Sequence, residues 1–520
     1  MELMLVLAVA APLFGAVLVW AWRERAAAHW VGVGAAAAAL VAVALLPIGR
    51  GNGNWMTYGA SLEGGWWHQV DFTWAPSLHL DFAIAVDGIS WPLALLTALL
   101  GLLCCLHNAL GAERHTSGSL QVGAANVATG GPSLAAGKTV GVPGKPSPML
   151  TVLLLAVQFA STLVFFADNL ILFFIAFEAV LLPMWAMIRR YGDPAARRHA
   201  AAKFALFTVA GSLLMATGLF VAVADIGTAD LGAIIVAGGV SPGLSLLVFA
   251  LLAIGFAVKA PLWPLHSWLP DAHTAAPTVG SVLLAGVLLK LGTYGLIRVA
   301  GGLAPQGAAD AAPVLAVLAA LGILVAGLVC LSLPELKRLI AYSSVGHMGF
   351  VVLAFATGTE AGVNAALFGN LAHGLITPLL FFLVGALKAR THTGLLGSLG
   401  GLRLAAPMLA GVLGFAALAS LGLPGLAGFW GEAFTVYAAA ERGGAWFALA
   451  AAAAFGAFLA AAYLLRMLRR VSHGPVAPAT KGIGDVSTVE LVVWAPLVAG
   501  TLLLGLVPGP LLDLFGEGLL

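Results

Sequence analysis

The sequence predicts an all-α membrane protein with about 14 transmembrane helices. Of its 520 residues, 61% are hydrophobic and only 9% are charged, whereas soluble domains carry about 25% charged residues. Apolar runs of about 20 residues recur with short polar breaks, which is the length that a helix needs to cross about 30 Å of hydrocarbon. Backbone groups in lipid must be satisfied within each segment, so the runs are expected to be helical.

The apolar runs define the expected order of the spans along the chain. They centre near Ala10, Ala39, Ala98, Gln158, Glu178, Leu214, Leu252, Leu288, Ala320, Gly349, Leu375, Ala416, Phe455 and Ala499.

The loops between these runs alternate in charge. With the N-terminus outside, most of the 24 lysines and arginines fall in the loops on the inner side, as the positive-inside rule requires. Both termini are then outside. The outer loop 49–86 is rich in tryptophan and suits an interfacial cap. The inner segment 111–148 is rich in Gly, Ser and Pro and is expected to be a flexible cytoplasmic insertion.

Several ionisable residues fall inside the predicted spans, where each costs roughly 2.5–3.5 kcal/mol to insert. They are Glu178, Lys259, Lys290, His347, His373 and Glu432. Removal from water favours the neutral form of carboxyl and amino groups, and histidine already titrates near neutral pH. A set of such groups in one membrane therefore indicates a proton relay.

Two of the predicted spans contain helix breakers. The seventh continues into Pro261 and Pro264, with Lys259 beside the break, and the twelfth contains Pro424 and Gly425, with Glu432 beyond it. Breaks in corresponding spans of two halves are typical of inverted-repeat transporters with a site at the membrane midplane. We therefore expect two inverted five-helix repeats with discontinuous helices seven and twelve. The expected units are three N-terminal helices with the outer loop (1–110), the insertion (111–148), the first repeat (149–300), the second repeat (301–470) and a C-terminal helix (471–520).

The composition also limits the chemistry and the partners of the chain. Its three cysteines, Cys104, Cys105 and Cys330, lie in apolar runs and show no metal-binding spacing. We therefore expect no metal, no redox centre and no other cofactor in this chain. With a formal net charge of only +2, we expect no nucleic-acid partner. The expected environment is the lipid bilayer.

Four runs of residues resemble the signature of the antiporter-like, proton-translocating membrane subunits of NADH–quinone oxidoreductase, respiratory complex I. The runs are Lys259–Ser281 (KAPLWPLHSWLPDAHTAAPTVGS), Leu289–Tyr294, Pro334–Phe350 and Asn370–Gly374, and Glu178 with Pro183 matches as well. The resemblance covers the chain from the third span onward. Glu432 matches the M-type subunits, because the L and N types carry lysine at that position.

The resemblance implies a role for each site residue. Glu178 and Lys259 would form an interacting pair, Lys290 and His347 the central relay, and Glu432 its outer end. His266 and His373 would be additional members. It also implies a subunit of NADH:quinone oxidoreductase in the bacterial inner membrane, beside L-type and N-type neighbours, with quinone reduction taking place elsewhere in the complex.

Two other functions remain open from the sequence. A subunit of a Mrp-type multisubunit cation/proton antiporter would share the fold and most of these motifs. A standalone secondary transporter for a small solute is the other alternative, and apart from the proton-type residues no polar cluster supports it.

Overall fold

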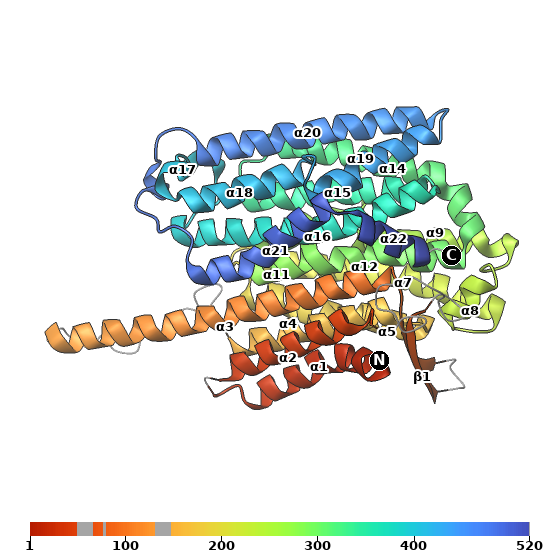
Figure 1. The fold of residues 1–520 in the computed structure, drawn as a ribbon, viewed down its shortest axis with the longest axis horizontal. Coiled ribbons are helices and arrows are strands. Elements are labelled where there is room, and N and C mark those ends of the chain that lie inside the picture. Colours follow the sequence, from red (N-terminus) through yellow and green to blue (C-terminus); the bar gives the residue numbers. More distant parts are fainter. Residues whose placement is uncertain (26, 49–65, 76–79, 130–146, 519–520) are drawn as a thin grey trace.

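The fold is a bundle of roughly parallel helices with a small β-hairpin at one end (Figure 1). A computed structural model describes residues 1–25, 27–48, 66–75, 80–129 and 147–518. Both ends of the chain lie toward the hairpin end of the bundle (Figure 1). This is the arrangement expected for an even number of crossings.

Within the described residues, thirteen helical segments are long and apolar enough to cross a membrane. They are α1 (Glu2–Ala21), α2 (Ala28–Leu45), the first part of α3 (Ser90–Thr129), α4 (Pro148–Phe166), α5 with α6 (Leu170–Ala179 and Leu181–Tyr191), α7 (Arg197–Ile226), α9 (Pro242–Lys259), α11 to α13 (Thr278–Leu303), α14 (Pro305–Ser332), α15 (Leu336–Ala356), α16 (Glu360–Thr391), α20 (Trp446–Ser472) and α21 (Thr488–Leu506). The short helices are α8 (Leu231–Val236), η4 (Leu396–Ser398), α17 (Leu402–Ala405), η5 (Pro478–Thr480) and α22 (Gly509–Gly518).

The two predicted helix breaks are confirmed. Span seven is α9 followed, after an irregular segment, by α10 (Trp268–Ala275). Span twelve, which is not among the thirteen segments above, is divided into α18 (Pro407–Ser420) and α19 (Ala427–Glu441). With it, the described residues make fourteen crossings. Between these two helices Gly422 and Gly425 have φ of +77° and +89°, values that glycine adopts without the strain that a Cβ brings.

Two further spans are irregular at places that the sequence analysis did not identify. In span five, α5 ends at Ala179 and α6 begins at Leu181, because Pro183 has no N–H to donate to the carbonyl of Ala179. Span eight is α11 (Thr278–Leu283), the π-helical turn η2 (Leu284–Leu288), α12 (Leu289–Tyr294), a second π-helical turn η3 (Gly295–Ala300) and α13 (Gly301–Leu303). Such π-helical turns are frequent at functional sites.

The outer loop contains an antiparallel hairpin of β1 (His68–Ala75) and β2 (Leu80–Val86). The sequence analysis expected a cap here but no strands. At the opposite end of the bundle, α3 extends beyond the other helices as far as Thr129 (Figure 1). Part of the expected insertion is thus helical, and residues 130–146 lie outside the described residues. The predicted unit boundaries stay predictions.

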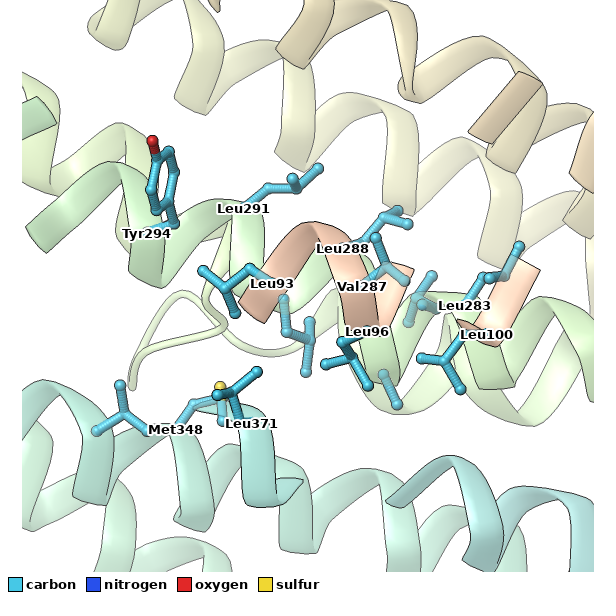
Figure 2. Packing of buried hydrophobic residues seen from close by; sticks show 14 of the residues in the cluster. Leu93, Leu96, Leu100, Leu283, Val287, Leu288, Leu291, Tyr294, Met348 and Leu371 are labelled. Carbon is cyan, nitrogen blue, oxygen red and sulfur yellow. The ribbon is translucent and has the colours of Figure 1, made fainter. Parts of the chain in front are cut away.

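The centre of the bundle is packed with leucines. Figure 2 shows the side chains of α3 against those of α11, η2 and α12, with α15 and α16 on the facing side. The labelled residues are Leu93, Leu96, Leu100, Leu283, Val287, Leu288, Leu291, Tyr294, Met348 and Leu371. All are at least nine-tenths buried. Any polar group at this depth therefore depends on protein partners, because unpaired burial is costly.

Candidate functional site

Four of the predicted site residues form a chain of contacts across the middle of the bundle. Lys290 Nζ lies 2.5 Å from His373 Nδ1. The rings of His373 and His347 are 5.8 Å apart at 62°. His347 Nδ1 lies 3.0 Å from Glu432 Oε1. The structure thus brings together one residue from each of the helices α12, α16, α15 and α19.

Lys290 is held in place by the irregular backbone of span eight. It is fully buried, and its ammonium donates to the carbonyl of Ala285, inside η2, at 2.6 Å. A π-helical turn leaves such carbonyls off the regular ladder, so they can accept from a side chain. One turn further along, Thr293 Oγ1 donates to Asn370 Oδ1 on α16 at 2.7 Å. These contacts fix the lysine against the helix that carries His373.

The two histidines border a small cavity whose polar lining includes Glu432. The cavity offers about 30 Å³ to the centres of water molecules, and both histidines and Glu432 line it. Since one buried water needs roughly 10–15 Å³ of such space, about two waters fit. His347 Nε2 also lies 3.2 Å from Ser420 Oγ, at the end of α18. The gap between the two rings can therefore be bridged by water.

The break in span twelve positions Glu432. Gly422, whose positive φ favours glycine, lies directly against the carboxylate: a Cβ there would lie 2.8 Å from Glu432 Oε2. The glutamate side chain is 11% exposed and that of His347 is 12% exposed. In such surroundings a charged hydrogen bond is stronger than one in water. The break supplies both the space and the polar lining for the carboxylate.

Glu178 and Lys259 lie near each other without direct contact. Ser212 Oγ on α7 donates a short hydrogen bond to Glu178 Oε1. Lys259 Nζ lies 4.3 Å from the ring centroid of Phe177, the residue before Glu178, a cation–π distance. It has no hydrogen-bond partner within the described residues. Glu178 is close enough to act electrostatically on Lys259, and the interaction predicted for them is through space.

No side-chain hydrogen bond joins Lys259 to Lys290 in the part of the chain that the structure describes. The helices that carry them are nevertheless in close contact. A Cβ at Gly292 of α12 would lie 2.5 Å from the Ala260 backbone nitrogen and 2.8 Å from the Phe256 carbonyl oxygen. Small residues at helix interfaces allow such close approach. The Glu178–Lys259 pair and the chain of contacts that begins at Lys290 are thus packed together but not directly bonded.

His266 stands apart from the contact chain. It lies in the irregular segment between α9 and α10, with its ring 6.0 Å from that of Tyr342. Its Nδ1 has no hydrogen-bond partner among the described residues. Its role as an additional relay member therefore stays a prediction.

Two further residues belong to this region and were missed by the sequence reasoning. His273 on α10 is fully buried, stacks on Phe381 at 4.5 Å, and neither of its ring nitrogens has a partner within the described residues. Its place in the Lys259–Ser281 run was the signal that could have identified it. Ser212, the hydrogen-bond donor to Glu178, has no such signal, because serines are common at helix interfaces in membranes.

The chain is similar to known membrane subunits of respiratory complexes. The family model described as "NADH:quinone oxidoreductase/Mrp antiporter, TM" matches residues 167–459. NADH-quinone oxidoreductase subunit M of Rhodobacter capsulatus is 41% identical over 370 residues, which cover 68% of this chain and 71% of the relative. An NAD(P)H-quinone oxidoreductase chain 4 of a Synechococcus strain is 38% identical, over 84% of this chain and 78% of the relative.

Solved structures show the same architecture. A chain of respiratory complex I from Thermus thermophilus, determined with bound NADH, matches with a TM-score of 0.82 and 29% identity, covering 99% of both chains. A chain of the Mrp complex from a Dietzia strain matches with a TM-score of 0.81 at 20% identity, covering 100% of this chain and 97% of its own. The second match is a likeness of fold.

Proposed function

Because the chain belongs to the family of NADH:quinone oxidoreductase and Mrp antiporter membrane subunits, we propose that Lys290, His373, His347 and Glu432 carry its proton. The chain is a proton-translocating, antiporter-like membrane subunit of NADH:quinone oxidoreductase. The observation that supports the proposed path is the pair of contacts at its ends, 2.5 Å between Lys290 and His373 and 3.0 Å between His347 and Glu432.

The path works because each histidine has two ring nitrogens. An imidazole accepts a proton on one nitrogen and releases another from the second. His373 faces Lys290 through Nδ1, which leaves Nε2 for the water-sized cavity that the ring borders. His347 faces Ser420 through Nε2 and Glu432 through Nδ1. A proton from the Lys290 ammonium thus reaches the carboxylate through two rings and one or two waters.

Glu178 and Lys259 act on this path as a charge switch. Lys259 and Lys290 stand on helices whose backbones are in close contact, and charges in such surroundings act on one another without a direct bond. The ammonium of Lys259 has no hydrogen-bond partner within the described residues. The negative charge of Glu178 offsets the positive charge of Lys259. When that offset is lost, the Lys259 cation repels the Lys290 cation, which favours proton transfer from Lys290 to His373.

The oxidoreductase chemistry takes place in other subunits under this proposal. The three cysteines of this chain are buried, and the residues that line the path are proton carriers. Quinone reduction elsewhere in the complex would supply the energy, which makes the assembly a translocase. L-type and N-type subunits are the proposed neighbours, and the bacterial inner membrane is the proposed location, with both termini on its outer side.

A test of the path is the change His373→Gln in the assembled complex. Glutamine fills similar space and offers polar atoms but does not take up a proton near neutral pH. Positioned proton transfer contributes typically 10²–10⁴-fold, so coupled proton translocation should fall at least tenfold in sealed vesicles. The exposed His473 provides the control, and His473→Gln should pump normally. An assembled His373→Gln complex that pumps like the parent would overturn the proposed path.

The Mrp-type antiporter subunit is the second candidate function, because the family model covers both systems. Identification of the copurifying subunits separates the two. Peripheral subunits that oxidise NADH support the first function, and a membrane-only assembly supports the second.

A further inference from the structure

A buried carboxyl group at the hairpin end of the bundle is not used by the path described above. Asp168 lies between α4 and α5 and is 1% exposed. Its Oδ1 accepts from the backbone N–H of Gly232 and its Oδ2 from Gln69 Nε2, both at 3.0 Å. Both donors are neutral, although a carboxylate has about four acceptor sites. The hydrogen bond from Gly232 favours the charged form, but burial opposes it and is the larger effect.

Among the described residues, acidic groups outnumber basic ones around Asp168. The charged groups that act on it are Asp230, Arg298 and Asp87. Arg298 is paired with Asp87 at 3.0 Å, and Asp87 Oδ1 also accepts the backbone N–H groups of Ile89 and Ser90. Among the described residues, three carboxyl groups thus lie within electrostatic reach of one guanidinium, and a like charge disfavours ionisation of the least supported member.

Asp168 is that least supported member. Asp230 is exposed and caps α8 by accepting from Ala233 N at 2.7 Å, while Asp87 has the arginine. Burial, with Asp230 as the next contribution, raises the pKa of Asp168 to about 7. Its proton is therefore bound below neutral pH and released as the pH rises through about 7.

The same cluster lies at the end of the helix face that carries Lys290. Tyr294 and Arg298 follow Lys290 at intervals of four residues, so the three lie on one side of the helix within about 12 Å along its axis. Tyr294 Oη donates to the Phe165 carbonyl at 3.1 Å, three residues before Asp168. The neutral groups around Asp168 in the described part of the chain include Trp66, Gln69, Ala83 and Gly232.

We propose that Asp168 is a second proton-exchange site, which binds and releases protons at the outer face of the half that contains Lys290. This rests on the proton translocation described above. Only O–H bonds form and break: the Asp168 carboxyl loses its proton to outer water and regains one from water. The competing interpretation is a structural clasp, since Asp168 joins the hairpin to the first turn of α8.

Infrared difference spectroscopy on the assembled complex in membranes tests the proposal. The parent should show a protonated-carboxyl band that disappears as the pH rises through about 7, in line with the raised pKa of Asp168. Asp168→Asn should lose that band and should flatten the pH profile of proton translocation between pH 6 and 8. Asparagine keeps an acceptor for Gly232, and the Gln69 amide can turn to accept from it.

The matched control is Asp230→Asn, because asparagine also caps helices. It should keep the titrating band, moved to lower pH because the like charge of Asp230 is gone. His373→Gln should keep the band unchanged, whatever that variant does to pumping. A band that persists in Asp168→Asn, or a pH profile that matches the parent, makes the residue a clasp only and overturns the proposal. Normal pumping by His373→Gln would instead refute the central path, but it would not affect the conclusion that Asp168 exchanges protons.

Discussion

Glu432→Gln is the sharpest test of the outer end of the path. The change keeps the size and the hydrogen-bonding oxygen of the side chain but removes its charge and its proton. The carboxylate lies 3.0 Å from His347 Nδ1, and both side chains are nearly buried. At this separation and an effective dielectric constant of about 20, the attraction to a protonated histidine is on the order of 5 kcal/mol.

Desolvation offsets much of that attraction. Hydrogen bonds to charged groups contribute a net of roughly 1.5–3 kcal/mol, and 1.36 kcal/mol corresponds to a factor of ten. The contact between Glu432 and His347 should therefore lose most of this stabilisation when Glu432 is replaced by glutamine. The proposed path passes through that contact, so proton translocation should fall by at least tenfold, together with the tightly coupled NADH–quinone turnover.

The assay is proton uptake by sealed inverted vesicles, alongside NADH oxidation in the same preparation. Glu441→Gln is the matched control, because Glu441 is the last residue of the same helix and is exposed. Both variants should assemble. If Glu432→Gln assembles, turns over and pumps as Glu441→Gln does, then Glu432 only fills the break and the outer end of the path lies elsewhere.

Two further changes probe the remaining parts of the site. Glu178→Gln should leave assembly intact and strongly depress coupled turnover, since glutamine cannot ionise; normal pumping by the assembled variant would remove the charge switch. Gly292→Ala should lower the amount of assembled complex, because its Cβ would meet backbone at 2.5 Å and such overpacking costs typically 1–3 kcal/mol. Gly243→Ala, with open space around the added atom, should assemble normally on native gels, and equal yields of the two would refute the packing argument.

The sequence predicted the spans and the two breaks because both are local properties. Hydropathy over about 20 residues determines what can cross the bilayer, and proline interrupts a helix wherever it stands. The hairpin was not predicted, since its strands pair residues across a turn and their short apolar segments resemble any other loop. The π-helical turns of span eight were also missed, because nothing in the letters 284–300 distinguishes them from regular helix.

Contacts between helices were harder to predict than the helices themselves. The sequence identified Lys290, His347, His373 and Glu432 as titratable, but not their order. His373 was the less certain member, yet it is the one that touches Lys290. Which faces meet depends on packing between residues 83 positions apart, and the spacing within one helix does not determine it. His266 shows the converse, because it belongs to the same run as Lys259 but lies away from the contact chain.

The leucine packing around the site explains how a path with gaps can still be coupled. Water among these side chains would screen each charge and would offer the proton alternative routes. The buried leucines of α3 and of span eight exclude it (Figure 2), so charges interact over longer distances than they do in water. Lys259 therefore needs no hydrogen bond to Lys290 in order to influence it. The last turn of α9, where Lys259 stands, further stabilises a cation through the helix dipole. The break thus places the charge of Lys259 where a change in the charge of Glu178 has its largest electrostatic effect.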